Sequence, residues 1–208
     1  MKFVLFFTAL LLTFPSLAKH PFAASMQEGD IIFQQSQSGQ SEALREITGS
    51  VWTHVGVIVR HQGQFYVAEA SRRVELTRLH DFIERGVGRR YVIKRVRPDL
   101  LAMNGAQRAR LRSTLRSFDG KGYDVWFQWS DDVIYCSELV WKAFDRAFGL
   151  ELSRPERFRD FPLNGPEAAR LIRERYSNTG REFNLNELVV SPVALLRSEL
   201  LVDVERAD

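Results

Sequence analysis

A predicted β-hairpin constrains the fold of this chain more than any other segment. Apolar and β-branched residues dominate Val51 to Arg60 and Phe65 to Ser71, and the connection between them, His61-Gln62-Gly63-Gln64, carries a turn signal at Gln62-Gly63. Strands joined by so short a connection pair antiparallel. With Gln62 and Gly63 as the turn, the register of the whole hairpin is fixed.

This register gathers polar residues on one face of the hairpin. His54 faces Ser71 and Gly56 faces Glu69, and because side chains alternate between faces, all four share one face. Glu69 is then diagonal to His54, with about 7–8 Å between the backbones, a span that two long polar side chains can bridge. Gly56 leaves the space between them empty. The opposite face is apolar and is expected to pack against the core.

Cys136 is the only cysteine, so it cannot form a disulfide within the chain. It can be an apolar core residue, a link to a second chain or a reactive thiol. A helix is predicted to start at Cys136 and to end before Gly149, with Val140, Ala143 and Ala147 on the same apolar face as the cysteine. The sulfur then lies in the first helical turn, where the helix stabilises a thiolate.

A histidine beside a carboxylate, together with a thiol at a helix N-terminus, is the set of groups that a cysteine hydrolase needs. The acid fixes the tautomer of the histidine and stabilises the imidazolium that forms when the thiol loses its proton. Taken alone, His54 and Glu69 would be explained as well by a simple cross-strand polar pair. With Cys136, the sequence predicts a nucleophile, a base and an orienting carboxylate.

Beyond the hairpin, strands and helices alternate. The expected elements are a strand at Asp30 to Gln34, a loop and short helix within Ser36 to Ser50, a strand at Tyr91 to Arg97 and a helix from Gly105 to Phe118 after the cap Asn104. The segment from Leu150 to Asp208 is expected to be mainly helical, with Ser191-Pro192 opening a last short helix.

Residues 1–18 have the features of a secretory signal peptide. Lys2 supplies a positive charge, an apolar run too short to span a bilayer follows, and Ser16 and Ala18 suit cleavage after Ala18. The alternative is a buried N-terminal strand or an uncleaved anchor. Residues 19–208 fit one domain, and no later apolar stretch approaches the roughly 20 residues of a membrane helix.

The charge balance gives no sign of a nucleic-acid partner. The formal net charge is +3, and Lys2 is one of the 29 basic residues that face 26 acidic ones. Nucleic-acid binding needs basic residues concentrated on one surface. Neither a cysteine pair nor a His-x-x-x-His spacing occurs, so we expect no metal site and no cofactor.

Five separated motifs carry a family resemblance: Gly29-Asp30-Ile31-Ile32-Phe33, Thr53-His54-Val55-Gly56, Ala68-Glu69-Ala70, Gly122-Tyr123-Asp124 and Tyr135-Cys136-Ser137-Glu138-Leu139-Val140. In order and spacing they resemble the YiiX-like permuted papain-fold amidases, relatives of the NlpC-type cell-wall hydrolases. Unpermuted relatives place the Cys-Ser helix before the histidine strand. The resemblance implies an α+β fold, a circularly permuted papain-like domain whose antiparallel, barrel-like sheet packs against the cysteine helix.

The resemblance also implies a reaction. Cys136 attacks a carbonyl and forms a thioester, His54 acts as base and then as acid, and Glu69 is the third polar residue. The implied substrate is an amide, with peptidoglycan stem peptides or related wall fragments as the expected class, and export to the periplasm fits that substrate.

Three further residues are matched by the resemblance with less chemical support. Tyr123 corresponds to a tyrosine whose hydroxyl lies near the oxyanion site, although a wedged core aromatic would have the same pattern. Asp131 and Asp132 resemble a family loop and can bind a substrate amine, or can be ordinary turn residues.

Two rival functions stay open. The same core resembles lipid acyl hydrolases and acyltransferases, which predicts activity on acyl lipids and an apolar groove lined by Trp126, Phe127 and Trp129. The second rival is a binding module with an idle triad. Substrate choice depends on loop shape, and the sequence does not separate these functions or indicate an oligomeric state.

Overall fold

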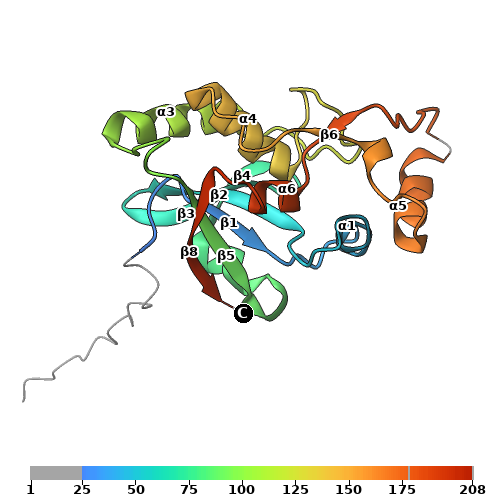
Figure 1. Cartoon of the computed structure of the whole chain (residues 1–208), viewed down its shortest axis with the longest axis horizontal. Helices are drawn as coiled ribbons and strands as arrows, with labels where there is room; N and C mark the ends of the chain where they lie inside the picture. The colour runs from blue at the N-terminus through green and yellow to red at the C-terminus, as the bar shows by residue number, and fades with distance from the viewer. Residues whose placement is uncertain (1–24, 178, 208) are drawn as a thin grey trace, which may run out of the picture.

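An open antiparallel sheet of six strands organises the chain (Figure 1). The computed structural model describes residues 25–177 and 179–207. In spatial order the strands are β4 (Val74–Arg78), β3 (Gln64–Ala70), β2 (His54–His61), β1 (Ile31–Gln34), β5 (Tyr91–Val96) and β8 (Leu201–Ala207). Within the described residues, β4 and β8 are the free edges. The barrel-like sheet that we expected is therefore not closed.

Helices cover both faces of the sheet and extend from one end of it. They are α1 (Ser41–Thr48), α2 (Leu79–Glu84), α3 (Gly105–Arg116), α4 (Cys136–Phe148), α5 (Pro166–Tyr176) and α6 (Pro192–Leu196). In Figure 1, α3 and α4 lie together on one side of the sheet, and α1 and α5 lie together beyond its end. Helix α4 packs across β2 and β3, and α2 packs against β3 and β4.

The predicted hairpin register is confirmed. Val57 pairs with Ala68 and Arg60 pairs with Phe65, as a turn centred on Gln62-Gly63 requires. Both turn residues have positive φ, 50° and 76°, which is the conformation that matches the twist of the flanking strands. The predicted apolar face of this hairpin lies in the main core with the buried face of α4.

The C-terminal third was predicted wrongly as mainly helical. It contains α5 and α6, but also a small sheet of β6 (Glu156–Arg157) and β7 (Leu188–Val189) and the long edge strand β8. Strand β8 exists because β5, far earlier in the chain, supplies its hydrogen-bond partners. The sequence prediction also omitted β4, α2 and two short 3₁₀ turns, Val87–Arg89 and Phe158–Asp160.

Two predictions concern membranes and export. Residues 1–18, the expected signal peptide, lie outside the described residues. Within 25–177 and 179–207, no helix combines the length and apolar character needed to cross a bilayer.

Candidate active site

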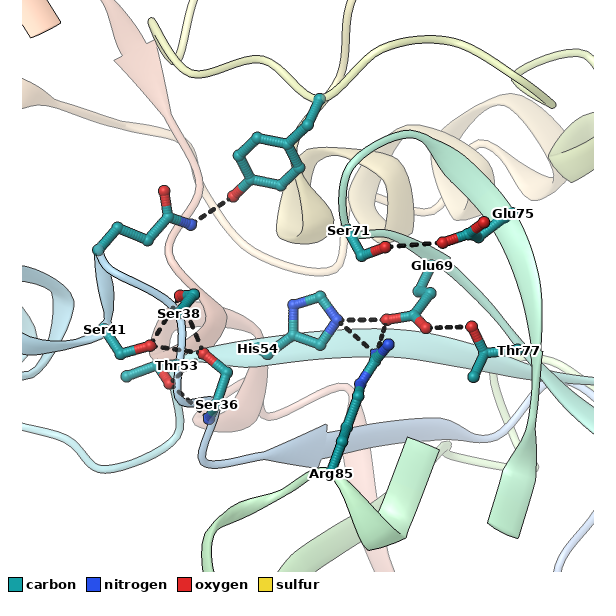
Figure 2. A network of polar contacts seen from close by, with 12 residues as sticks. Ser36, Ser38, Ser41, Thr53, His54, Glu69, Ser71, Glu75, Thr77 and Arg85 are labelled. Atoms are coloured by element: carbon teal, nitrogen blue, oxygen red, sulfur yellow. Dashed lines mark hydrogen bonds and ion pairs between the residues drawn. The ribbon is translucent and has the colours of Figure 1, made fainter. Parts of the chain in front are cut away.

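The contact predicted between His54 and Glu69 is present in the structure (Figure 2). His54 begins β2, and Glu69 lies near the end of β3, where its side chain is fully buried. The imidazole Nε2 is 2.5 Å from Glu69 Oε2. A Cβ at Gly56 would lie 2.9 Å from the Ala68 carbonyl oxygen and 3.3 Å from Glu69 Cβ. Glycine at this position thus allows the close approach of the two strands beneath the pair.

Two residues that sequence reasoning missed hold the carboxylate of Glu69. Arg85, at the end of α2, donates to Glu69 Oε2, the oxygen that faces His54, and Thr77 on β4 donates to Oε1 (Figure 2). Burial raises the pKa of Glu69, but its hydrogen bonds with His54 and Thr77 and the charges of His54 and Arg85 outweigh burial and lower the pKa to about 2. Glu69 is therefore an anion at neutral pH.

Cys136 lies at the first position of α4, beside the imidazole of His54. Its side chain is buried, forms a hydrogen bond with the His54 ring, and accepts hydrogen bonds from the backbone N–H groups of Val55 and Ser137. Because Nε2 of His54 faces Glu69, the other ring nitrogen, Nδ1, is the one available to the sulfur.

Charge separation between Cys136 and His54 follows from these contacts. Burial raises the pKa of the Cys136 thiol, but the His54 charge and the hydrogen bonds from His54, Val55 and Ser137 lower it below its ordinary value. For His54, burial lowers the pKa, whereas the thiolate and Glu69 raise it to about 9. Both shifts favour charge separation, with a thiolate on Cys136 and an imidazolium on His54.

The first turn of α4 is fixed by contacts with the segment before α6. Ser137 Oγ donates to the Val190 carbonyl oxygen at 2.6 Å, and the Val190 N–H donates to the Tyr135 hydroxyl at 3.0 Å. Within the helix start, the Tyr135 N–H donates to the Glu138 carboxylate at 3.3 Å. These contacts hold the Cys136 backbone in place against the start of β2.

Tyr123 also contacts the sulfur of Cys136 and is held by a chain of hydrogen bonds. Its hydroxyl contacts Cys136 and accepts a bond of 2.6 Å from Gln40 Nε2. Gln40 Oε1 in turn accepts from Arg175 at 2.5 Å. A guanidinium can only donate, so the amide oxygen of Gln40 must face Arg175 and the amide nitrogen must face Tyr123. The Tyr123 proton is left to point away from Gln40, toward the sulfur.

Asp131 and Asp132 are not brought to the thiol. Asp131 is paired with Lys142 at 2.9 Å and with Arg146 at 2.6 Å, and those hydrogen bonds lower its pKa to about 2. Both aspartates are exposed, and neither lines a cavity beside Cys136. The structure gives Asp131 two partners in α4 and offers no support for a role in binding a substrate amine.

Two cavities meet at the site. The first, which we call the apolar cavity, has a volume of about 70 Å³ and is lined by Cys136 and by side chains of α1, α5 and neighbouring loops: Leu44, Ile47, Phe158, Leu171, Ile172 and Val190. The second, the arginine cavity, has a volume of about 680 Å³ and is lined by His54 and by Arg72, Arg85, Arg170 and Arg175. Three residues, Tyr123, Leu171 and Arg175, line both cavities.

The groove expected of a lipid enzyme is only partly as predicted. Phe127 lines the apolar cavity, but Trp126 and Trp129 line neither cavity. Trp126 packs on Tyr176 and Trp129 packs on Trp141, so both tryptophans serve to pack loops.

Relatives of known sequence or structure share this architecture. The chain is 36% identical over 206 residues to "Uncharacterized protein YiiX" of Escherichia coli (strain K12), covering 99% of this chain and 96% of that protein. A crystal structure described as metalloprotein yiiX from Escherichia coli O157:H7 superposes with a TM-score of 0.82 at 37% identity, covering 88% of this chain and 98% of the other.

The word metalloprotein describes that relative and is not carried over to the present chain. Among residues 25–177 and 179–207, no group of three or more His, Cys, Asp or Glu side chains is arranged to hold a metal ion. The side chains of His54 and Glu69, which would be metal ligands beside Cys136, are bound to each other instead. Glu69 is also bound to Arg85. These residues do not fit a metal site of the usual kind.

Residues 25–202 match the profile of a family described as permuted papain-like amidase enzymes, YaeF/YiiX, C92 family. The match covers strands β1 to β5 of the six-stranded sheet and the start of β8, together with the helix that carries the cysteine. It agrees with the α+β fold and with the order His, Glu, Cys along the chain. The chain therefore belongs to the YaeF/YiiX, or C92, family of permuted papain-like amidases.

Proposed function

We propose that this protein is a cysteine hydrolase that cleaves amides through a thioester on Cys136. The observation that carries the proposal is the continuous contact from Cys136 to His54 to Glu69, in which the pKa of the thiol is lowered and the pKa of the imidazole is raised. Such a pair supplies both a nucleophile and a proton for the leaving group. An idle binding module has no need of either.

The proposed reaction has two acyl transfers. The Cys136 thiolate attacks the carbonyl carbon, the C–N bond breaks, and the leaving nitrogen takes the proton of the His54 imidazolium. His54, now neutral, then removes a proton from water, whose oxygen attacks the thioester carbonyl. The C–S bond breaks, which regenerates the thiolate and the imidazolium and releases the carboxylic acid. Amide and water are thus converted into acid and amine, with no other reactant.

The negative charge that develops on the carbonyl oxygen requires hydrogen-bond donors. We propose the Tyr123 hydroxyl, whose proton the Gln40 contact directs toward the sulfur, and the backbone N–H of Cys136, which has no partner within its helix at this position. Burial raises the pKa of Tyr123 well above its ordinary value, so the hydroxyl keeps its proton and can donate it.

Trapping the thioester would test the proposed function. Purified protein mixed with an activated acyl ester, and quenched in acid within seconds, is expected to gain the mass of one acyl group on the peptide that contains Cys136. The variant Cys136→Ala is the control and should gain none. Acylation of both proteins to the same extent would contradict the proposal.

The finer substrate assignment is also a proposal. Peptidoglycan stem peptides contain amide bonds beside carboxylates, and the arginines around the second cavity support a substrate of that charge. The apolar cavity beside Cys136 supports the second candidate function, hydrolysis or transfer of acyl groups from lipids. Release of soluble product from purified peptidoglycan fragments and from acyl lipids, measured in parallel, would separate the two.

The substitution Gln40→Glu should reverse the orientation of the Tyr123 hydroxyl. A carboxylate at position 40 would accept from Arg175 and from Tyr123, so the Tyr123 proton would turn away from the sulfur. We expect kcat to fall by about tenfold to a hundredfold with little change in KM, since an oxyanion donor acts mainly in the transition state.

Two controls show whether Gln40 acts through Tyr123. Gln64→Glu adds the same charge at an exposed position outside both cavities and is expected to leave kcat nearly unchanged. In a Tyr123→Phe background, Gln40→Glu should have little further effect. If it lowers kcat as much in that background as in the wild type, Gln40 does not act by positioning the tyrosine.

Export to the periplasm, with cleavage after Ala18, is part of the proposal because peptidoglycan lies outside the cytoplasm and residues 1–18 have the pattern of a signal peptide. N-terminal sequencing of the protein from cell envelopes is expected to begin at Lys19. A mature protein that still begins at Met1 would contradict it.

A further inference from the structure

We propose that the two cavities divide the substrate, so that the apolar cavity holds a short apolar acyl half and the arginine cavity holds a leaving amine that carries an anionic group. This inference rests on the proposed function, because it assigns the two sides of the bond that Cys136 would cleave. It names the substrate class as amides between a small apolar acid and an anionic amine.

The positions of the nucleophile and the base determine which half of the substrate each cavity would hold. Cys136 lines the apolar cavity and His54 lines the arginine cavity. In the thioester the acyl carbon is bonded to the sulfur, so the acyl group must start from the Cys136 side. The leaving nitrogen must take its proton from His54, so the amine must lie on the His54 side. Water for the second step then enters through the wider, arginine cavity once the amine has left.

The lining of the apolar cavity matches an uncharged acyl group of limited size. Its walls are aromatic and aliphatic side chains, and the single charged side chain among them, Arg175, is directed by hydrogen bonds to the Val125 carbonyl oxygen and to Gln40. A water molecule needs roughly 10–15 Å³ of such space. A cavity of about 70 Å³ therefore accepts a chain of a few carbons or one small side chain, and a longer acyl chain would have to extend beyond it.

Four arginines and one acidic residue, Glu174, line the arginine cavity, so positive charge is in excess there. Arg85 is paired with Glu69, and Arg170 is paired with Glu167 and Glu174. Within the part of the chain that the structure describes, Arg72 and Arg175 have no ion-pair partner. Arg175 is half-buried and its hydrogen bonds go to neutral oxygen atoms, a setting in which an incoming anion is favoured.

The backbone places Arg72 beside the proposed oxyanion donor. The Arg72 carbonyl oxygen accepts a hydrogen bond of 2.9 Å from the Tyr123 N–H. Its exposed side chain lines the arginine cavity, where a carboxylate or phosphate on the leaving amine would come within reach. Arg73, the next residue, is also exposed but lies outside the cavity and is paired with Glu75 at 3.5 Å. This neighbour is a matched control for the charge of Arg72.

A set of matched amides tests the division. The probes are pentanoylglycine, its neutral amide pentanoylglycinamide, pentanoyl phosphoethanolamine, dodecanoylglycine, and the reversed compound N-pentylsuccinamate, whose charge is on the acyl half. We expect kcat/KM for the anionic pentanoyl amides to exceed that of the neutral one by at least about tenfold, and both dodecanoylglycine and the reversed compound to be poor substrates. The glycine and phosphoethanolamine arms distinguish a carboxylate from a phosphate as the preferred anion.

Variants test whether the arginine cavity causes the preference for an anionic amine and the apolar cavity causes the preference for short acyl chains. Arg72→Gln should bring the ratio between anionic and neutral amides toward one, while Arg73→Gln leaves it unchanged. Ile172→Ala should enlarge the apolar cavity and raise the relative rate on longer acyl chains. Leu196→Ala, a similar truncation of a half-buried core residue outside the cavity, should not shift the preferred length.

The acyl ester of pentanoic acid with 4-nitrophenol separates this inference from the proposed function, because its leaving group carries no anion when it is bound. If Cys136 forms a thioester with that ester but the amides show no preference for an anionic amine, or if the reversed compound is favoured, the division of the substrate is wrong while the hydrolase stands. If no probe acylates Cys136, both proposals fail.

Discussion

Replacing His54 with alanine is expected to abolish the reactivity of Cys136 below pH 7 and to lower amide turnover by at least about a thousandfold. Burial alone would raise the pKa of the Cys136 thiol, and the charge of His54 is the first of the groups that lower it. Without the imidazolium, the thiolate loses its counter-ion in a buried site. The same substitution removes the proton that the leaving amine needs.

Alkylation rate as a function of pH measures the first effect directly. Wild type should react readily below pH 7, and His54→Ala only as the pH approaches the ordinary thiol pKa of about 8.5. A low-pKa thiolate is intrinsically less nucleophilic, so the difference in rate at pH 6 is expected to be on the order of tenfold or more. His61→Ala, at the exposed end of the same strand, is the matched control.

Turnover and alkylation should differ at high pH. The pKa of His54 is raised to about 9, so the imidazolium is present below that pH and is lost as the pH rises through it. Turnover should then fall, because the leaving amine receives no proton, whereas alkylation of the thiolate should not fall. Identical alkylation profiles for wild type and His54→Ala would show that no such ion pair exists and would favour the binding module over any hydrolase.

Local patterns predicted the central part of the site. The turn at Gln62-Gly63 set the register of β2 and β3, and the register placed Glu69 diagonally across from His54. The helix start at Cys136 followed from an apolar period and from Gly149 at the other end, where the backbone has the left-handed conformation that ends helices. Both inferences used interactions between residues near one another in sequence.

Residues from distant segments could not be placed in this way. Arg85 reaches Glu69 only because α2 packs back over β3 and β4, and the sequence prediction contained neither α2 nor β4. Gln40 and Arg175 meet because α1 docks on α5, although the two residues are 135 positions apart. For the distant strand β8, a usable signal was the alternation of apolar and polar residues over Val202-Asp203-Val204-Glu205, which is typical of a half-buried strand.

The substitution Glu69→Gln is expected to lower turnover by about tenfold to a hundredfold while the fold persists. Glu69 accepts from His54 and Arg85 at one oxygen and from Thr77 at the other. A glutamine can keep its oxygen toward His54 and Arg85 and donate its amide to the Thr77 hydroxyl, which can rotate to accept. The geometry is then retained and only the negative charge is lost.

Loss of that charge should act through the pKa of His54. Glu69 raises the pKa of His54. In the plot of turnover against pH, the fall at alkaline pH should therefore occur at a lower pH in the variant than the value of about 9 expected for wild type. Glu75→Gln, on the neighbouring strand and bound to Ser71, removes a charge without touching His54 and should leave the pH of this fall unchanged.

The pH dependence of stability in acid gives an independent measurement of the effect of the Glu69 charge. The pKa of Glu69 is lowered from 4.5 to about 2, so its contribution to stability is complete above pH 4.5 and is lost as the pH falls toward 2. Glu69→Gln lacks that contribution at every pH, so its free energy of unfolding should depend less on pH between 4.5 and 2 than that of wild type. If turnover and its fall at alkaline pH are unchanged in Glu69→Gln, the carboxylate does not support His54, and Arg85 holds it for a structural reason alone.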